Sequence, residues 1–320
     1  MSPSPTPAPR SILIIGLGEL GTAILSALTA HPSYPSHRTK LAVLRRPGSL
    51  ASPPSAQKSD STTPPVQFET ADLAAAPLAE LVRIFQRYDL VIQAAGFGAP
   101  PGTQLRVAEA AVRAGVARFV PWQFGVDYDA IMNGPGGGVG GEEGLFGEMV
   151  RVRELLRAQQ RTRWTVISTG LFMSFLFLPL FGVVDLRRRV VRALGGWDQR
   201  ITLTAVEDVG RMVAEVVFVR PEETEDKVVF AAGDTVSYGE IADVVEGVYG
   251  AGFEREVWGK DELRRRMDRE PENGMVKYQN VFGGGVGVAW EKEKTLNYQR
   301  GVVLMNLKEY VEKNKVRLVE

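Results

Sequence analysis

Short apolar segments alternate with amphipathic segments through the first half of the chain. The short segments carry runs of apolar and β-branched side chains, which is typical of strands buried on both faces of a parallel sheet. The longer segments have apolar residues at helical spacing. The expected strands are Ser11–Ile15, Leu41–Leu44, Val66–Glu69, Leu90–Gln93, Arg118–Val120 and Trp164–Ile167, and the expected helices are Leu20–Thr29, Leu78–Arg87, Thr103–Ala114 and Leu145–Gln159. This alternation predicts an α/β fold with a Rossmann-type doubly wound parallel sheet.

After Gly170 the alternation is less regular, and a smaller unit is expected. Further short strands are expected at Ile201–Thr204, Lys227–Phe230 and Glu254–Val257. Further helices are expected at Val206–Phe218, Tyr238–Tyr249, Lys260–Arg269 and Asn306–Lys315. We therefore predict a disordered tail (1–10), a dinucleotide-binding domain (11–170) and a smaller C-terminal α/β region (171–320). That last region is expected to pack on the sheet edge and contribute the substrate pocket.

Two irregular stretches interrupt the pattern. Pro47–Pro65 is rich in Ser, Pro and Thr and is expected to be a mobile surface insertion. Asn133–Gly144 is rich in glycine and follows the fifth expected strand, on the edge where ligands bind in such folds. Both a lid over the site and a disordered excursion fit this second stretch.

Composition excludes several classes of function. The 320 residues carry a formal net charge of zero, so no electrostatic binding of nucleic acid or of an anionic membrane is expected. The absence of cysteine excludes disulfides, thiolate metal sites and cysteine nucleophiles, and no metal is expected. His31 and His37 lie in a polar stretch and are expected to be solvated. The Pro/Ser-rich start lacks the apolar core of a signal peptide, and the longest apolar run is broken by Pro179. We expect a cytoplasmic monomer or homodimer.

A glycine-rich turn follows the first expected strand. It has the pattern G-x-G-x-x-G and opens an amphipathic helix. In this arrangement the first glycine allows a tight turn, the second lets backbone amides approach a pyrophosphate, and the third permits close helix–strand packing. The helix N-terminus favours the phosphates. The residues expected to bind the dinucleotide here are Gly16, Gly18, Glu19, Leu20 and Gly21.

The end of the second expected strand favours NADP(H) over NAD(H). An acidic residue at this place binds the ribose 2′-hydroxyl of NAD, whereas this chain has Arg45 and Arg46. Two guanidinium groups suit a 2′-phosphate and the adenine ring, although a solvated arginine pair has the same sequence. At the end of the fourth expected strand, Ala94, Ala95 and Gly96 leave room for the nicotinamide ribose close to the backbone.

Several motifs resemble those of a known family. Arg118–Asp127 is similar to the K-R-F-x-P-S-E-F-G-x-D segment of the NmrA-like, isoflavone-reductase-like family, an atypical branch of the short-chain dehydrogenases/reductases. That family includes the plant phenylcoumaran benzylic ether and pinoresinol-lariciresinol reductases. The resemblance extends over nearly the whole chain, through Leu90–Gly96 with Gln104, Trp164–Phe172 and Thr204–Gly210, and Trp122-Gln123 with Phe181–Asp185 resembles its fungal secondary-metabolism branch. It implies an NADP(H)-binding oxidoreductase, with further cofactor contacts from Gln123, Phe124, Thr169 and Gly170.

The same resemblance places a catalytic lysine where this chain has a methionine. In the family a Phe-x-x-Lys turn supplies the general acid/base beside the nicotinamide, and the matching segment here begins at Phe146 and ends at Met149. A thioether does not donate a proton usefully. No lysine occurs between Lys58 and Lys227, although a chain with ten lysines and 28 arginines has long lysine-free stretches in any case. Simple inward packing on an amphipathic helix also accounts for this methionine.

Other groups in this region are candidates for proton transfer. The nearest in sequence are Glu148, Tyr128, Asp127 and Gln123. The Tyr-x-x-x-Lys pair of ordinary short-chain dehydrogenases is absent: Met132 stands four residues after Tyr128, and no other tyrosine is followed by a lysine at that spacing.

An aromatic segment indicates the substrate. Leu171–Phe181 suits a flat hydrophobic ligand, but a core helix would have much the same sequence. The expected substrate contacts are Trp122, Met149, Phe172, Phe175 and Phe177. Asp208 stands at an expected helix start, where capping is its expected role.

Three functions remain open at this point. The first is hydride transfer from NADPH to a hydrophobic polycyclic secondary metabolite, aromatic or alkaloid-like, without the family's lysine. The second is a redox-neutral cyclisation or isomerisation in an NADP-bound pocket. The third is a non-catalytic NADP sensor that regulates a partner protein. The complete dinucleotide motif beside an apolar segment favours a small-molecule enzyme over the sensor, and our prediction is the first function.

Overall fold

The computed structural model describes residues 7–34, 39–49, 66–96, 98–134 and 145–317, and the chain divides into two compact units. Unit 1 comprises residues 1–123, 148–167 and 209–229, and unit 2 comprises residues 124–147, 168–208 and 230–320. The units are therefore interleaved along the chain instead of meeting at one boundary near residue 170. Much of the expected insertion (50–65) and of the expected loop (135–144) lies outside the described residues.

Unit 1 is built on a seven-stranded sheet with the strand order β11-β6-β5-β4-β1-β2-β3. All pairings from β3 through β6 are parallel. The strands are β1 Ser11–Ile15, β2 Lys40–Arg45, β3 Gln67–Thr70, β4 Leu90–Gln93, β5 Arg118–Val120, β6 Arg163–Ser168 and β11 Lys227–Phe230. Strand order reverses at β1, as in doubly wound dinucleotide-binding folds, so the predicted fold class is confirmed. The expectation that residues 227–230 belong to the C-terminal region is wrong, because β11 joins this sheet at the β6 edge.

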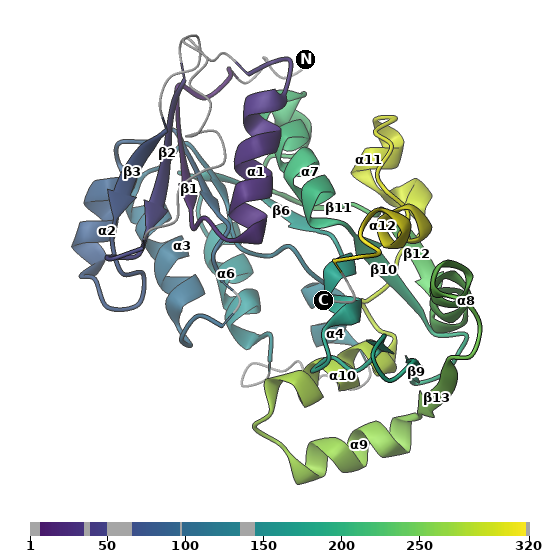
Figure 1. Cartoon of the computed structure of the whole chain (residues 1–320). Coiled ribbons are helices and arrows are strands. Elements are labelled where there is room, and N and C mark those ends of the chain that lie inside the picture. Colours follow the sequence, from purple (N-terminus) through teal and green to yellow (C-terminus); the bar gives the residue numbers. More distant parts are fainter. Residues whose placement is uncertain (1–6, 35–38, 50–65, 97, 135–144, 318–320) are drawn as a thin grey trace. The chain divides into compact units, whose positions relative to one another are not determined.

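Five helices cover the sheet: α1 Glu19–Ala30, α2 Leu78–Phe85, α3 Thr103–Ala114, α6 Gly147–Arg157 and α7 Val206–Phe218. Figure 1 shows α1 and α7 on one face and α2, α3 and α6 on the other. Helices α1 and α7 approach closely at Gly210, where a Cβ would collide with the backbone of Ala23. On this face His31 stacks on Phe218 with ring centroids 5.1 Å apart, so it is not simply solvated as expected.

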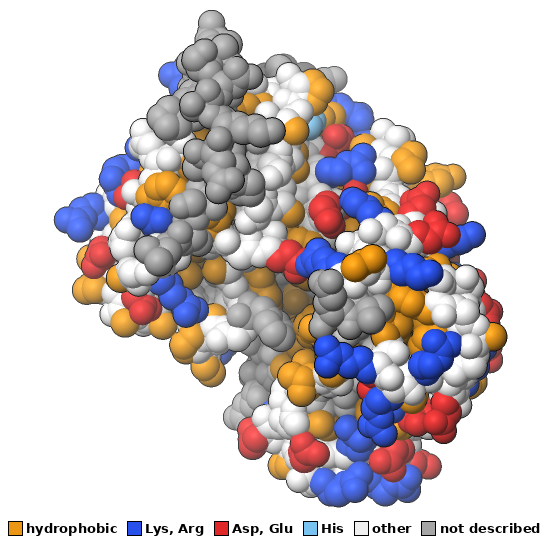
Figure 2. All heavy atoms as spheres, viewed as in Figure 1, with side chains coloured by type: hydrophobic (Ala, Val, Ile, Leu, Met, Phe, Trp, Pro, Cys, Tyr) orange, Lys and Arg blue, Asp and Glu red, His pale blue; other side chains and the backbone are white. Residues whose placement is uncertain are grey.

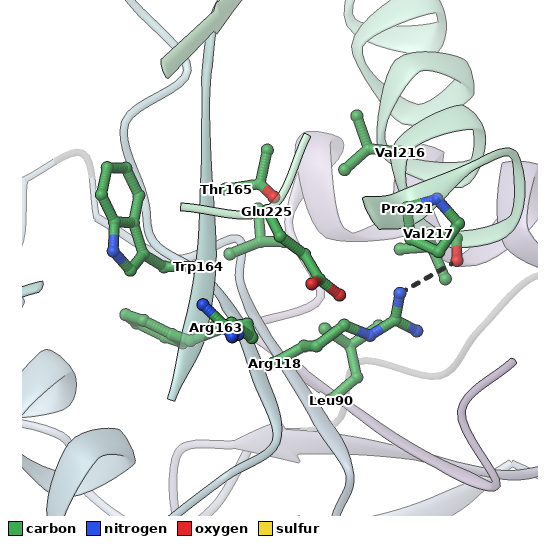
Figure 3. Close-up of a pocket in the computed structure, with 11 residues that line it drawn as sticks. Leu90, Arg118, Arg163, Trp164, Thr165, Val216, Val217, Pro221 and Glu225 are labelled. Carbon is green, nitrogen blue, oxygen red and sulfur yellow. Dashed lines mark hydrogen bonds between the residues drawn. The ribbon is translucent and has the colours of Figure 1, made fainter. Parts of the chain in front are cut away.

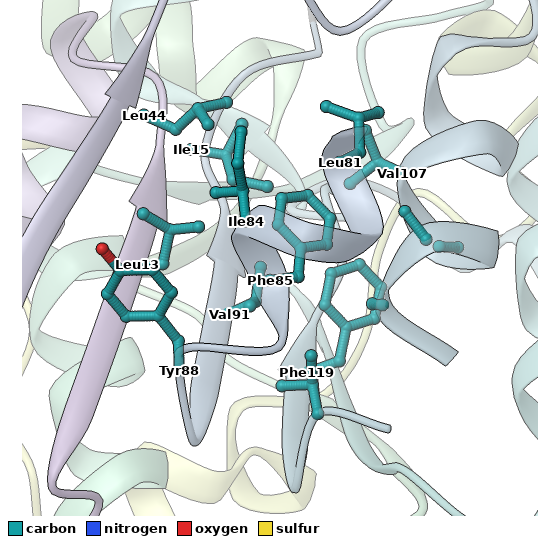
Figure 4. Packing of buried hydrophobic residues seen from close by; sticks show 14 of the residues in the cluster. Leu13, Ile15, Leu44, Leu81, Ile84, Phe85, Tyr88, Val91, Val107 and Phe119 are labelled. Carbon is teal, nitrogen blue, oxygen red and sulfur yellow. The ribbon is translucent and has the colours of Figure 1, made fainter. Parts of the chain in front are cut away.

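A large hydrophobic cluster fills the core between the sheet and the second helical face. Phe85 and Phe119 are fully buried, and Tyr88, three residues after the end of α2, is 3% exposed. Figure 4 shows these rings among the aliphatic side chains of β1, β4 and α3. The residues of the central strands β1, β2 and β4 are buried on both faces, which explains why these strands are continuous apolar runs instead of alternating patterns.

Unit 2 contains two three-stranded sheets, with the orders β12-β10-β7 and β13-β9-β8. Their strands are β7 Leu171–Phe172, β8 Val184–Asp185, β9 Val190–Leu194, β10 Arg200–Thr204, β12 Asp234–Ser237 and β13 Glu254–Trp258. The helices of unit 2 are α4 Tyr128–Asn133, α8 Tyr238–Tyr249, α9 Lys260–Arg269, α10 Gly274–Gly284, α11 Leu296–Gln299 and α12 Leu307–Lys313. This unit also contains the short 3₁₀ helices η2 Met173–Phe177 and η4 Lys292–Lys294, whereas η3 Pro221–Glu223 belongs to unit 1. Sequence analysis did not anticipate β9, β12 or α10.

The described surface carries charges of both signs close together. On α9, for example, Glu262 pairs with Arg265 and Arg269, and Figure 2 shows red and blue side chains mixed over this helix. Among the described residues, no helix has the length and apolar character needed to cross a membrane.

Candidate functional site

The glycine turn after β1 has the geometry expected of a dinucleotide-binding loop. Gly16 has φ +93° and donates its N–H to the Leu44 carbonyl, which brings the turn against the end of β2. A Cβ on Gly21 would lie within 3.0 Å of the Gly16 carbonyl oxygen, so only glycine allows α1 to start so close to β1. A Cβ on Gly18 would meet nothing within 4 Å.

The start of α1 is open to an anion. Gly18 is the N-cap residue and has no side chain to bond the first-turn amides. Glu19, the first helical residue, is exposed, whereas Leu20 is buried and packs inward. A pyrophosphate fits this cradle, because a helix N-terminus offers uncapped N–H groups and a partial positive charge.

Two arginines stand at the end of β2. The Arg45 guanidinium lies over the Phe68 ring, 4.2 Å from its centroid, and Arg46 is exposed. The neighbouring Asp72 has a lowered pKa, mainly because it accepts the N–H groups of residues 75 and 74, with a further contribution from Arg46. Both guanidinium groups are thus at the edge where the adenosine end of a dinucleotide lies in this fold.

A buried amide network supports the turn after β4. Gln93 is 1% exposed and Gln104, on α3, is 5% exposed, and the two side chains are hydrogen-bonded to each other. Gln93 donates to the Ala95 carbonyl (3.4 Å), and Gln104 donates to the Gly96 carbonyl (3.3 Å). The network fixes the small residues predicted to face the nicotinamide ribose. Above them, the indole of Trp122 covers Gly96.

Gln123 is the centre of a second buried network. Its Oε1 accepts a hydrogen bond from Nε of Arg153 (2.7 Å), and its Nε2 donates to the carbonyl oxygen of Met149 (2.8 Å). Gln123 is 1% exposed and Arg153 is fully buried. Because both functional ends of the amide are engaged, Gln123 serves to position the first turn of α6, which carries Met149, and is poorly placed to exchange protons.

Met149 occupies the first turn of α6. Its side chain is 7% exposed, and Val152 and Leu156 on the same helix are buried in the apolar core. The inward packing considered from the sequence is therefore present. It also means that no proton donor occupies this position.

Glu148, a candidate for proton transfer, bonds to the start of α3. Its carboxylate accepts the N–H of Gly102 (3.0 Å) and of Leu105 (2.9 Å). The N-cap of α3 is Gly102, which has no side chain, so Glu148 caps this helix from 46 residues away in sequence. This arrangement favours a structural role for the carboxylate over a role as a proton shuttle.

The other two candidates belong to unit 2. Asp127 is the N-cap of α4 and accepts the N–H of Ala130 (3.3 Å). Tyr128 is 3% exposed, and its ring lies 4.9 Å from that of Phe146. Its hydroxyl packs over Gly125, where a Cβ would lie 2.7 Å from the phenolic oxygen.

Thr169 and Gly170, which are predicted to contact the cofactor, are buried and held by backbone hydrogen bonds within unit 2. Thr169 is fully buried, and the N–H groups of both residues donate to the Gly125 carbonyl (3.0 Å each). Gly170 has φ +71°, and a Cβ there would collide with the backbone of Thr202. Phe124, 7% exposed, is likewise buried.

Asp208 stands at the start of α7, where a capping role was expected. It lies in the first turn of that helix, is 2% exposed, and accepts the N–H of Met305 at 2.6 Å. Its carboxylate therefore fixes the chain segment before α12.

The aromatic segment forms β7 and the turn η2, so it is not a core helix. Phe172, Phe175 and Phe177 are half-buried, whereas Met173 and Leu176 between them are buried. Three exposed or half-buried rings in one short segment are consistent with a surface that receives an apolar ligand.

Tyr278 on α10 was not among the residues predicted from the sequence to form the site. Its ring lies 5.6 Å from that of Phe146 and 6.1 Å from that of Phe175, so within unit 2 it connects the aromatic segment to Phe146. Burial raises the pKa of its phenol to about 12. No sequence signal pointed to it, because α10 was not predicted.

One described pocket lies away from these residues. It is lined by Leu90, Arg118 and Arg163, the first residues of β4, β5 and β6, together with residues near Pro221 and Glu225. Figure 3 shows Arg118 lying in it and donating to the Val217 carbonyl. This is the amino end of the strands, opposite the glycine turn, and it has room for about one water molecule. Within the described residues no cluster of potential metal ligands occurs.

Comparisons with known proteins agree with this geometry. The chain matches the NmrA-like family over residues 9–310. It is 44% identical over 313 residues to an NmrA-like family domain-containing oxidoreductase of Gibberella moniliformis, covering 94% of this chain and 97% of that one. Its fold is similar to that of a leucoanthocyanidin reductase from Vitis vinifera solved with NADPH (TM-score 0.74, 19% identity, 97% and 100% covered). It is also similar to the pinoresinol-lariciresinol and phenylcoumaran benzylic ether reductases (TM-score 0.72, 21% identity, 95% and 98% covered). The chain belongs to the NmrA-like family.

Proposed function

We propose that the protein is a cytoplasmic NADP(H)-dependent oxidoreductase that acts by hydride transfer on a hydrophobic polycyclic secondary metabolite, without a lysine as proton donor. The observation that carries the proposal is the combination of an intact dinucleotide-binding loop with a buried Met149 where the family resemblance implies the lysine.

Residues of unit 1 fit the cofactor. The uncapped start of α1 suits the pyrophosphate, and the guanidinium groups of Arg45 and Arg46 suit a 2′-phosphate. The oxidoreductase name of the Gibberella relative and the NADPH held by the Vitis reductase support this assignment. When bound, NADPH supplies a hydride, that is, two electrons and one proton, and leaves as NADP⁺.

Three of the residues considered for proton transfer are already held in hydrogen bonds, which favours a hydride-accepting substrate that needs little acid catalysis. Glu148 caps α3, Gln123 bonds Arg153 and the Met149 carbonyl, and Asp127 caps α4. A substrate that already carries positive charge, such as an iminium, takes up hydride at carbon and needs no proton. A carbonyl substrate would instead take its proton from solvent.

The test is incubation of the purified protein with NADPH deuterated at C4 of the nicotinamide and with a panel of polycyclic iminium and carbonyl compounds. Transfer of deuterium to product carbon, with one NADPH consumed per product, supports the proposal. Product formed without NADPH consumption would instead indicate a redox-neutral cyclase or isomerase. Tight NADPH binding with no turnover, together with a protein partner, would indicate a sensor.

A further inference from the structure

The indole of Trp122 lies flat on the backbone of Gly96. The three atoms nearest to an ideal Cβ on Gly96 are Cδ2, Cγ and Cε2 of that ring, all within 3.0 Å. Cδ2 is the nearest of the three, and two of the atoms bonded to it follow at almost equal distances, which is the pattern for a point over the ring face instead of beside its edge.

This packing depends on glycine at position 96. Any side chain there would have to occupy the volume of the indole, since its first atom would already penetrate the ring. The Gly96 carbonyl is in turn fixed by Gln104. One face of the Trp122 ring is therefore seated on a rigid backbone surface.

Part of the Trp122 side chain remains accessible. The residue is only half-buried, and within the described part of the chain its indole N–H has no hydrogen-bond acceptor, nor is that nitrogen buried. A tryptophan N–H usually finds a partner when it is buried. This donor is therefore open to a ligand.

The position is the ligand-binding edge of the sheet. Gly96 follows β4 and Trp122 follows β5, and these strands are parallel neighbours with Ile92 opposite Val120. Ligands of open α/β sheets bind outside the carboxyl ends of the strands.

We propose that Trp122, seated on Gly96, is a stacking platform that selects planar conjugated substrates carrying a hydrogen-bond acceptor. The inference rests on the proposed function and narrows its substrate class. The accessible ring face stacks on the planar system, and the indole N–H donates to a carbonyl or ether oxygen or to an aromatic nitrogen. A saturated polycycle of the same size cannot stack and binds more weakly.

The test uses a matched pair of probes, 2-acetylnaphthalene and its decahydro analogue, in calorimetric titrations of the NADP⁺-saturated protein. We expect the wild type to bind the planar ketone about tenfold more tightly than the saturated one. Trp122→Ala should remove this preference, and Trp122→Phe should retain part of it, because the stack remains and the N–H is lost. Trp197→Ala, another half-buried tryptophan, should keep the full preference.

Gly96 supplies an independent check. Gly96→Ala should remove the preference for the planar ketone, because the new methyl group displaces the indole. In the Trp122→Ala background the same substitution should change the affinities little, because the indole that it would collide with is absent. Thermal melting shows whether each variant is folded. Equal affinities of the wild type for the two ketones, or the same loss in Trp122→Ala and Trp197→Ala, would overturn the inference. Absence of NADP⁺ binding to the wild type would overturn the proposed function instead.

Discussion

The buried contacts of Gln123 give a quantitative prediction for Gln123→Leu. Leucine has nearly the same volume but no polar atoms, so the substitution leaves the Arg153 Nε–H and the Met149 carbonyl without their partner in an interior that excludes water. A buried donor on a charged group that loses its acceptor costs about 2–3 kcal/mol, and a buried carbonyl about 1–2 kcal/mol. We expect the free energy of unfolding to fall by about 3–5 kcal/mol.

A second substitution measures the interaction between Gln123 and Arg153. Arg153→Met removes the buried Nε–H that loses its Gln123 acceptor in Gln123→Leu, so the double variant should be more stable than the sum of the two single effects indicates, by about 2 kcal/mol. Gln123→Glu keeps the acceptor for Arg153 but loses the N–H donated to Met149, and it should be less destabilising than Gln123→Leu.

The assay is urea unfolding followed by both circular dichroism and tryptophan fluorescence, so that coincident transitions establish a two-state comparison. A loss below about 1 kcal/mol for Gln123→Leu, or strict additivity with Arg153→Met, would refute the reasoning. Either result would mean that these side chains are solvated or rearranged in the folded protein.

Three further predictions concern the cofactor site, the α3 cap and Tyr278. The double substitution of Arg45 and Arg46 by Ala should weaken NADPH binding at least about tenfold and leave NADH binding nearly unchanged in calorimetry, since only NADPH has the 2′-phosphate; equal losses for both would contradict the assignment. Glu148→Ala should lower stability by about 1–2 kcal/mol in urea unfolding by uncapping α3, with Glu154→Ala on the same helix as control. Because the folded pKa of Tyr278 is raised to about 12 from 10.0, its contribution to stability is full below pH 10 and is lost as the pH rises toward 12. Tyr278→Phe should therefore be less sensitive to alkali than the wild type, and identical alkaline unfolding curves would contradict the burial of the phenol.

The strands of unit 1 were predictable because burial on both faces leaves an unmistakable sequence pattern. Ser11–Ile15 and Leu90–Gln93 are continuous apolar runs bounded by polar or glycine residues, and their observed bounds match the expected ones. The glycine turn was equally clear, since its three glycines meet steric demands that only glycine satisfies.

The C-terminal half was harder to predict for a physical reason. Helix α10 ends in consecutive glycines, which have low helix propensity, and tertiary packing stabilises it instead. Tyr278 was missed with it. The strand β9 follows a run of arginines and was hidden by their polarity.

The roles of the candidate site residues could not be predicted from the sequence. The sequence offered Glu148, Gln123 and Asp127 as candidates for proton transfer, yet the contacts of Glu148 and Gln123 are with partners distant in sequence. Glu148 bonds α3 from 46 residues away, and Gln123 bonds Arg153 from 30 residues away. Local patterns contain no information about such contacts.

The most direct test of the central claim compares the pH dependence of NADPH consumption by the wild type and by Met149→Lys with one carbonyl substrate. If Met149 stands where a proton donor acts, the wild-type rate should change little between about pH 6 and 9. The lysine variant should be faster at low pH and lose that gain as the pH rises through the pKa of the introduced ammonium group. Superimposable profiles in a folded, NADPH-binding variant would contradict the claim that Met149 occupies the place of the general acid.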